Sequence, residues 1–175
     1  MAAGRNNKLK TAAIVPGSYD PVTRGHLYLI RYAAAKYEKV YAAIFVNKDK
    51  TCFFSPGERL ALLRAACARF RNVEVVYDEG MLWKFAQTHG VTVSVRGWRD
   101  DRDRAYEERM AAANKTFLNS LDTELIACPE ELRSVSSTSV RKALTSGADC
   151  RSILPFGTRR LLAEYMKKRR NTDVK

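Results

Sequence analysis

The most constraining feature of the sequence is a regular alternation of short apolar runs with amphipathic segments. The apolar runs are rich in β-branched residues and nearly continuous, which is typical of strands buried on both faces of a parallel sheet. They cover residues 11–15, 40–45, 73–77, 91–96 and 123–127. The alternation predicts a single α/β domain with a five-stranded, parallel, doubly wound (Rossmann-like) sheet. We expect right-handed crossovers, helices on both faces and a C-terminal helix.

The segments between these runs carry the signals of helices. The clearest start is Ser55, which is followed by Pro56 at the first helical position and by Glu58, the residue that completes a capping box. A further helix is predicted near Asp103, and its apolar repeat is expected to face the core. That repeat consists of Tyr106, Met110, Ala113 and Phe117.

The chain of 175 residues has a formal net charge of +12, which raises the question of nucleic-acid binding. Most of this surplus lies in the first ten and the last eighteen residues, and basic ends are more often solvated than binding arms. We therefore expect no nucleic acid as a partner. The expected organisation is a polar extension at 1–10, one domain at 11–168 and a basic tail at 169–175.

Hydropathy and cysteine usage exclude other classes of protein. No apolar run approaches the roughly 20 residues that a membrane-spanning helix needs, and the polar start lacks the apolar core of a secretory signal. We expect a cytoplasmic protein with no membrane partner. The four cysteines are scattered, without a CxxC pair or a nearby histidine, so no protein-held metal site is expected.

The stretch VPGSYDPVTRGH, residues 15–26, follows the first apolar run. It therefore lies at the carboxyl edge of the predicted sheet, where such folds bind ligands. Gly17 lets a ligand approach the backbone closely, and Ser18 offers a hydroxyl and an N–H. Thr23 is a candidate N-cap for a helix that carries His26 in its first turn. A helix N-terminus suits an anion, so the stretch predicts a phosphate site, with a capped turn and a surface histidine as the alternative.

Charged and hydroxyl side chains follow other predicted strands. Lys48 and Lys50 come after the second run, where they could reach a phosphate as mobile charges. Arg96 closes the fourth run and Arg99 follows after a short turn, which predicts a phosphate clamp. Residues 136–139 are all serine or threonine at the start of a helix. One such residue suffices for a cap, so the run favours a phosphate cradle.

The motifs that are absent narrow the chemistry. The sequence has neither a P-loop nor a G-x-G-x-x-G dinucleotide fingerprint. It also shows no acid pair with a nearby histidine and no Ser-His-Asp arrangement. Phosphate-binding groups without a nucleophile indicate group transfer by positioning and charge stabilisation.

Two of these segments together resemble the nucleotidyltransferase superfamily. GSYDPVTRGH resembles its T/HxGH signature, and SVSSTSVR resembles its ISSTxIR-like signature. RGWR resembles the RGLR segment of bacterial phosphopantetheine adenylyltransferases, although Trp98 stands where leucine is usual. The spacing of Lys50 and the segments GERLAL, NVEVV and YEE also follow that family, from about Thr11 to Pro155.

The resemblance implies a reaction. The phosphate of 4′-phosphopantetheine would attack the α-phosphorus of ATP directly, without a covalent enzyme intermediate. Dephospho-CoA and pyrophosphate would leave, and Mg²⁺ would assist together with ATP. The resemblance also implies a homohexamer, with coenzyme A as a candidate feedback inhibitor.

The resemblance further implies roles for individual residues. The catalytic set would be His26, Lys50 and Arg99, in which His26 stabilises the transition state. The set that binds phosphopantetheine would be Ser18, Lys50, Leu82 and Arg96. The set that binds ATP would be Gly17, Ser18, Tyr19, His26, Gly97, Trp98, Arg99, Glu107, Leu132, Arg133, Ser134, Val135, Ser136, Ser137 and Thr138.

The sequence leaves alternatives open. One is a sister nucleotidyltransferase that acts on another phosphorylated acceptor such as nicotinate mononucleotide, against which the RGWR segment argues. Another is a non-enzymatic nucleic-acid-binding protein, suggested by a pI of about 9.8 and opposed by the position of the charge. An inactive scaffold of the same fold would need a broken motif, yet His26, Arg99 and the Ser/Thr run are all present.

Overall fold

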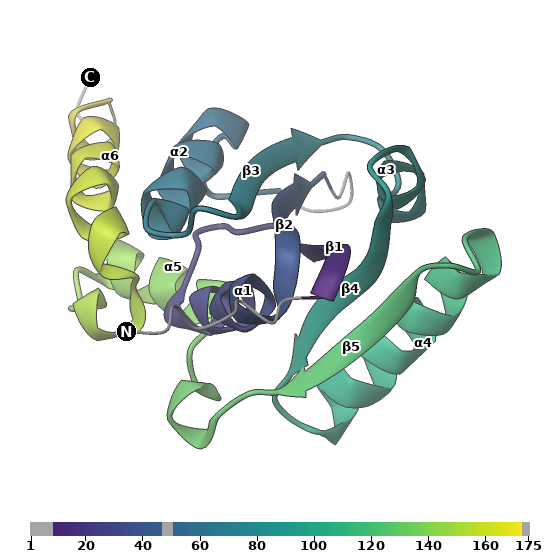
Figure 1. The fold of residues 1–175 in the computed structure, drawn as a ribbon. Helices are drawn as coiled ribbons and strands as arrows, with labels where there is room; N and C mark the ends of the chain where they lie inside the picture. Colours follow the sequence, from purple (N-terminus) through teal and green to yellow (C-terminus); the bar gives the residue numbers. More distant parts are fainter. Residues whose placement is uncertain (1–8, 47–50, 173–175) are drawn as a thin grey trace, which may run out of the picture.

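The computed structural model describes residues 9–46 and 51–172. Within these residues a parallel sheet of five strands forms the centre, in the order β3-β2-β1-β4-β5 (Figure 1). The strands are β1 (Leu9–Gly17), β2 (Tyr37–Phe45), β3 (Val73–Asp78), β4 (Val91–Trp98) and β5 (Asp122–Ala127). The predicted doubly wound sheet is confirmed, and each strand contains the apolar run that predicted it.

Helices cover both faces of this sheet (Figure 1). They are α1 (Arg24–Lys36), α2 (Pro56–Cys67), α3 (Leu82–Thr88), α4 (Asp101–Phe117), α5 (Ser137–Ser146) and α6 (Arg159–Thr172). Short 3-10 turns are η1 (Glu130–Leu132), η2 (Arg151–Ile153) and η3 (Phe156–Thr158). Helices α1, α2, α5 and α6 build the larger core on one face, and α3 and α4 lie on the other.

Strand β1 shows how one central strand serves both cores. Ala13 and Val15 point to one face and join the larger core, whereas Ile14 points to the other and packs with Phe85 and Leu121. Ile14 is fully buried, and Val15 is nearly so. Burying such a side chain stabilises the fold by about 1.5–3 kcal/mol. This packing fixes the register of β1 and therefore the position of the loop that follows it.

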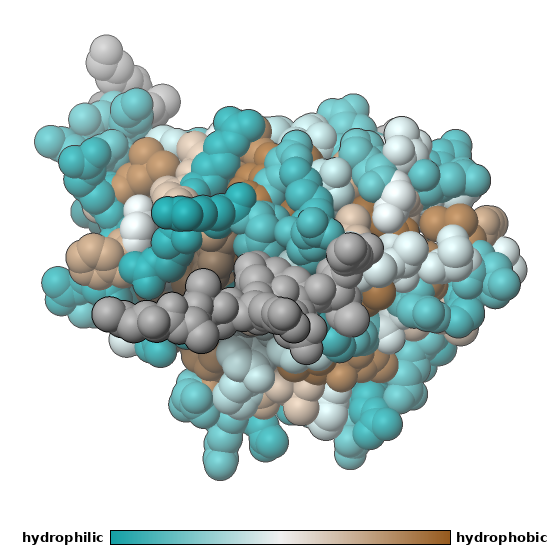
Figure 2. All heavy atoms as spheres, in the orientation of Figure 1, coloured by the Kyte–Doolittle hydropathy of each residue, from teal (hydrophilic) through white to brown (hydrophobic). Residues whose placement is uncertain are grey.

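The C-terminal helix continues beyond residue 168, where the domain was expected to end. Arg169 donates from NH2 to Glu58 Oε2 at 2.8 Å, and its guanidinium lies 4.6 Å from the ring centroid of Phe53 and 4.9 Å from that of Phe54. At least this part of the basic end therefore packs on the domain. The surface around α6 is otherwise largely hydrophilic, at the left of the view in Figure 2.

The apolar repeat of α4 does not face the core, so that prediction is wrong. Tyr106 is 52% exposed, Met110 41% and Phe117 62%, and Ala113 is exposed as well. Helical spacing shows that residues share a face, but it does not show which face the sheet will cover. Phe117 instead stacks on Trp83 of α3, with ring centroids 5.6 Å apart.

None of the helices in the described ranges combines the length and the apolar character that a membrane crossing requires.

Candidate active site

A cleft of about 670 Å³ opens at the carboxyl ends of the strands. The ends of β1 and β4 form its floor, the starts of α1 and α5 form one wall, and α4 with the start of α3 forms the other. Ligands of parallel α/β folds bind at this edge of the sheet. The fold therefore gathers the strand-end segments that the sequence singled out.

The cleft brings many of the predicted site residues together. Those that line it are Gly17, Ser18, His26, Leu82, Arg96, Gly97, Arg99, Glu107, Val135, Ser136, Ser137 and Thr138. Predicted ATP-binding residues that do not line it are Tyr19, Trp98, Leu132, Arg133 and Ser134. Lys48 and Lys50 lie outside the described residues. The roles assigned to all these residues remain predictions.

His26 serves as part of the helix cap of α1. The backbone N–H of Thr23 donates to His26 Nδ1 at 3.0 Å, and the His26 N–H donates to Thr23 Oγ1 at 3.4 Å. These two bonds form a capping box in which histidine takes the place usually held by glutamate or glutamine. Because Nδ1 accepts a hydrogen bond, the neutral ring carries its proton on Nε2. The ring therefore keeps an N–H donor for a ligand in the cleft.

The imidazole of His26 is neutral at physiological pH. Its burial, followed by the positive charges of Arg96 and Arg99, lowers its pKa from 6.5 to about 4. The ring lies 4.9 Å from the ring of Tyr19, which is fully buried and donates from its hydroxyl to the Val15 carbonyl at 2.6 Å. Tyr19 thus packs against the imidazole of His26.

Arg96 is held from two directions. Its Nε and NH2 donate to the two carboxylate oxygens of Glu107 at 2.7 and 2.8 Å, and its NH1 donates to the Pro16 carbonyl at 2.8 Å. Burial disfavours the charge of Arg96, but Glu107 outweighs this effect and raises the arginine's pKa. A guanidinium has five N–H groups, so the fixed fork retains donors for a phosphate.

The turn after β4 positions Arg99. Its Nε donates to Asp103 Oδ2 at 2.6 Å, in an ion pair that joins the turn to the first turn of α4. A Cβ atom at Gly97 would lie 2.8 Å from Leu29 Cδ1 of α1, so a larger residue at the end of β4 would require the Leu29 side chain to move. Trp98 does not line the cleft, and the guanidinium of Arg104 lies 5.5 Å from the centre of its ring.

The serine and threonine run forms both a cap and part of the cleft wall. Ser136 and Ser139 exchange hydrogen bonds in a capping box, each at 3.0 Å. Ser137 Oγ donates to the Pro21 carbonyl at 2.8 Å, and Thr138 Oγ1 accepts from Arg141 NH2 at 3.1 Å. Most of these hydroxyls are therefore engaged within the protein. The backbone N–H groups of the first helical turn are the natural ligand donors here.

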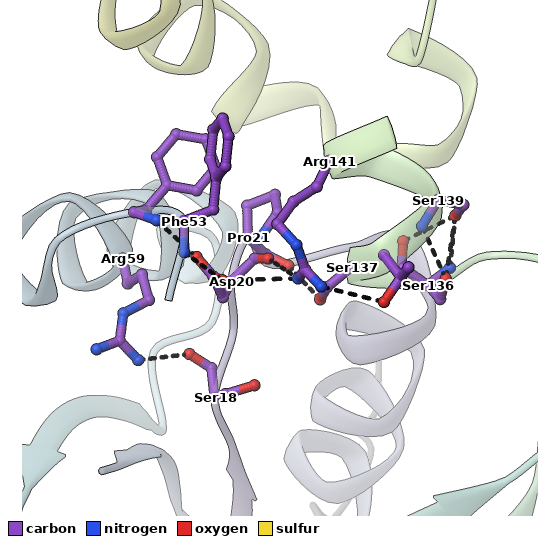
Figure 3. A network of polar contacts seen from close by, with 11 residues as sticks. Ser18, Asp20, Pro21, Phe53, Arg59, Ser136, Ser137, Ser139 and Arg141 are labelled. Carbon is purple, nitrogen blue, oxygen red and sulfur yellow. Dashed lines mark hydrogen bonds and ion pairs between the residues drawn. The ribbon is translucent and has the colours of Figure 1, made fainter. Parts of the chain in front are cut away.

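Three residues behind the cleft were missed from the sequence (Figure 3). Asp20 is 5% exposed, and its carboxylate accepts backbone N–H groups of the segment before α2. Arg59 donates to the Ser18 carbonyl at 2.9 Å. Arg141 donates to the Asp20 carbonyl at 2.6 Å. Their partners lie far away in the sequence. The only signals were a turn-forming Asp-Pro pair and the arginine that ends the SVSSTSVR segment.

The cleft also has an apolar wall, of which Leu82 was expected at the substrate site from the sequence, whereas Phe45 and Met110 were not. This apolar wall consists of Phe45, Met81, Leu82 and Met110. Met81 is 55% exposed. The cleft thus has a polar half at the helix starts and an apolar half beside α3 and α4, a combination that suits a ligand with a phosphate and an uncharged arm.

Comparisons with known proteins agree with this geometry. A sequence model of the cytidylyltransferase-like family matches residues 14–143. A phosphopantetheine adenylyltransferase from Streptococcus mutans is 37% identical over 142 residues, which cover 81% of this chain and 86% of the relative. Another, from Methylococcus capsulatus, is 36% identical over 154 residues, which cover 88% and 95%.

A solved structure shows the same fold. Plasmodium falciparum nicotinic acid mononucleotide adenylyltransferase, complexed with NaAD, matches with a TM-score of 0.62 at 18% identity. The match covers 90% of this chain and 96% of that one. The fold is thus shared with adenylyltransferases of other acceptors, whereas the sequence identity singles out one family. By that identity, the chain belongs to the phosphopantetheine adenylyltransferase family.

Proposed function

We propose that the protein transfers the adenylyl group of ATP to 4′-phosphopantetheine, releasing dephospho-CoA and pyrophosphate. The observation that carries this proposal is the 37% identity to a phosphopantetheine adenylyltransferase, in a chain whose strand-end segments form one cleft. A phosphate oxygen of the acceptor forms a bond to the α-phosphorus of ATP. The bond from that phosphorus to the bridging oxygen of pyrophosphate breaks in the same displacement.

The cleft would accelerate this step by placing donors around the phosphates. His26 Nε2–H donates to an oxygen on which negative charge develops, and its neutral form means that no proton has to be gained or lost first. Arg99 adds a positive charge, and the N–H groups at the starts of α1 and α5 add further donors. No side chain has to act as a nucleophile.

The acceptor would lie along the floor and the apolar wall. Arg96, fixed by Glu107, and Ser18 would bind its phosphate together with Lys50. The apolar wall would cover the uncharged pantetheine arm, which explains why Met81 and Leu82 line a cleft that otherwise handles charge. Replacing Arg96 by methionine should raise the KM for phosphopantetheine about tenfold, the usual effect of losing a charged hydrogen bond. Arg102→Met, at an exposed site on α4, is the matched control.

Magnesium would enter with ATP rather than bind to a protein cage. Among the described residues no group of three or more His, Cys, Asp and Glu side chains is placed to hold a metal ion. Phosphate oxygens are ligands that Mg²⁺ prefers, and the ion would neutralise charge on the leaving pyrophosphate. We expect chelation by EDTA to stop turnover without changing the thermal stability of the protein.

Assembly, regulation and location belong to the same proposal. Exposed Phe117, stacked on Trp83 outside the cleft, marks an apolar surface that a homohexamer could bury. Light scattering would measure the mass. Coenzyme A carries the same pantetheine arm, so we expect it to inhibit in competition with phosphopantetheine. A cytoplasmic location would place the enzyme with its ATP supply.

A pyrophosphate-release assay with a panel of acceptors tests the proposal. We expect release with ATP, Mg²⁺ and 4′-phosphopantetheine. Nicotinate mononucleotide and phosphocholine should give no release above background. Turnover of nicotinate mononucleotide but not of phosphopantetheine would overturn the proposed acceptor while leaving the chemistry intact.

A further inference from the structure

Arg141 ends the SVSSTSVR segment, yet it does not line the cleft. From the fifth position of α5 its side chain reaches back towards the loop after β1 (Figure 3). Its NH1 donates to the Asp20 carbonyl at 2.6 Å and lies 3.5 Å from Asp20 Oδ2. Its NH2 donates to Thr138 Oγ1 at 3.1 Å. One guanidinium therefore joins a buried loop to a residue of the cleft wall.

Asp20 is the other half of this connection. Its carboxylate accepts the backbone N–H of Phe53 through Oδ2 and that of Phe54 through Oδ1, both at 2.8 Å. The residue is only 5% exposed, and a buried carboxylate must be matched by charge and hydrogen bonds. Arg141 provides the charge. Removing Arg141 would leave the buried carboxylate of Asp20 without its charge partner.

A second bond ties the same two segments together. Ser137 Oγ donates to the Pro21 carbonyl at 2.8 Å, next to the bond between Arg141 and the Asp20 carbonyl. The loop is therefore attached to α5 at two consecutive residues. Ser18, two residues before Asp20 in the same loop, lines the cleft. The loop and α5 therefore present their cleft residues from a shared support.

We propose that Asp20 and Arg141 are a pair of positioning residues for the transfer reaction. They set the separation between Ser18, on the acceptor side, and Thr138, on the nucleotide side, although neither residue of the pair lines the cleft. This inference rests on the proposed function. Direct transfer between two bound substrates depends on their alignment, and a displacement of about 1 Å can lower the rate about 100-fold.

Kinetics of Asp20→Asn, Arg141→Met and the double variant test the pair. Each single variant should lower kcat about 100-fold, while the KM for ATP changes less than about threefold. Because both act through one contact, the double variant should be no worse than the poorer single one. Arg141→Lys keeps the charge but not the fork, so it should recover part of kcat. Lys142→Met, at an exposed site on the same helix, should match the wild type.

Three kinetic outcomes would overturn the inference. If Arg141→Met weakens ATP binding tenfold or more while Asp20→Asn does not, Arg141 binds ATP directly. If the losses from the two single changes multiply in the double variant, the residues act independently. Near-wild-type kcat in Arg141→Met would also sink the proposal.

Hydrogen exchange separates this inference from the proposed function. In Arg141→Met, the amides of Phe53 and Phe54 should exchange faster than in the wild type, because Asp20 loses its charge partner. Unchanged exchange there would contradict the linkage even if activity fell. A wild-type protein that releases no pyrophosphate with any acceptor would refute the proposed function, whereas the exchange result would still decide whether the pair holds the loop.

Discussion

Helices α1 and α5 both begin at the cleft with a capping box, but their third residues leave different groups for a ligand. In α1 the box joins Thr23 to His26, and in α5 it joins Ser136 to Ser139. The Ser139 hydroxyl is used up, because it accepts from the Ser136 N–H and donates to the Ser136 carbonyl. The imidazole uses only Nδ1. The start of α1 therefore presents backbone N–H donors and a fixed side-chain donor, whereas the start of α5 presents mainly backbone N–H donors.

This difference shows how a single side chain can combine folding with chemistry. A ring with two nitrogens satisfies the cap with one and keeps the other for the cleft, which a hydroxyl or a carboxylate at the same position cannot do as well. The cap also fixes the tautomer and the direction of the ring. The difference between the two helix starts can be tested by substituting one helical position at a time, beginning with the third residue of α1.

The largest expected effect comes from His26→Gln and His26→Ala. Glutamine at this position can still accept the Thr23 N–H and complete the box, so His26→Gln removes the imidazole with little change to the helix start. Both variants should lower kcat by about 10²–10³, the usual loss for one transition-state donor. His26→Ala should in addition lose about 1 kcal/mol of stability with the cap.

Single-turnover pyrophosphate release and urea unfolding measure these two losses separately. A His26→Gln variant that keeps wild-type kcat would mean that His26 is needed only as a cap. Equal unfolding free energies for the glutamine and alanine variants would instead show that the capping box contributes nothing.

The second-largest expected effect is a loss of unfolding free energy at acid pH. The folded protein holds the pKa of His26 near 4, against an ordinary value of 6.5. Between these values the unfolded chain binds a proton that the folded protein does not. The contribution of neutral His26 is therefore fully present above pH 6.5 and is lost as the pH falls towards 4, by on the order of 3 kcal/mol.

Urea unfolding of the wild type and His26→Gln at pH 7.5, 5.5 and 4.5 measures this linkage. The wild type should lose more unfolding free energy than the variant over the acid range. Parallel curves would show that His26 is not held neutral. Ser139 has no titratable group, so the start of α5 should add nothing to the difference.

Local features of both helix starts could be predicted from the sequence. Thr23 was expected to cap α1, and the run around Ser136 was expected at the start of a helix; both expectations are confirmed. The second function of His26 in the capping box was missed because that position usually carries glutamate or glutamine. Asp20 and Arg141 were missed for a different reason, since their contact spans 121 residues of sequence and only the folded topology creates it.

The error on α4 has the same origin. Its repeat correctly indicated a shared face for Tyr106, Met110 and Phe117, but periodicity contains no information about what packs against that face. The acidic side of the helix carries Glu107, whose partner Arg96 lies at the end of β4. Glu107 therefore lines the cleft, as its place in the predicted ATP-binding set suggested, whereas the hydrophobic pattern alone does not indicate this ion pair.

The second residue of α1 is Gly25, whereas the second residue of α5 is Thr138. A Cβ atom at Gly25 would lie 3.6 Å from Thr23 Oγ1 and 3.7 Å from the Val135 carbonyl, which are ordinary contacts. Gly25→Ala should therefore fold, with a stability equal to or up to about 1 kcal/mol above that of the wild type. The added methyl group would occupy space in the cleft, so ATP affinity should fall ten- to hundredfold. Calorimetric titration with ATP and thermal unfolding give the two values, and unchanged affinity would show that no ligand comes close to Gly25.

The smallest expected effect distinguishes the side-chain hydroxyl of Ser137, the first residue of α5, from its backbone N–H. Ser137→Ala removes the bond to the Pro21 carbonyl and should lower stability by about 1 kcal/mol, with ATP affinity within about threefold of the wild type.

Ser137→Pro removes the backbone N–H as well as the hydroxyl. Proline is favoured at this position, and the extended backbone of Ser136 (φ −139°, ψ 160°) suits a following proline. The proline variant should therefore fold like the alanine variant but bind ATP about tenfold more weakly, because it lacks one donor to a phosphate. If both variants bind ATP equally, the start of α5 contributes neither its first hydroxyl nor its first N–H to the nucleotide, and the chemistry of the cleft rests on the α1 side alone.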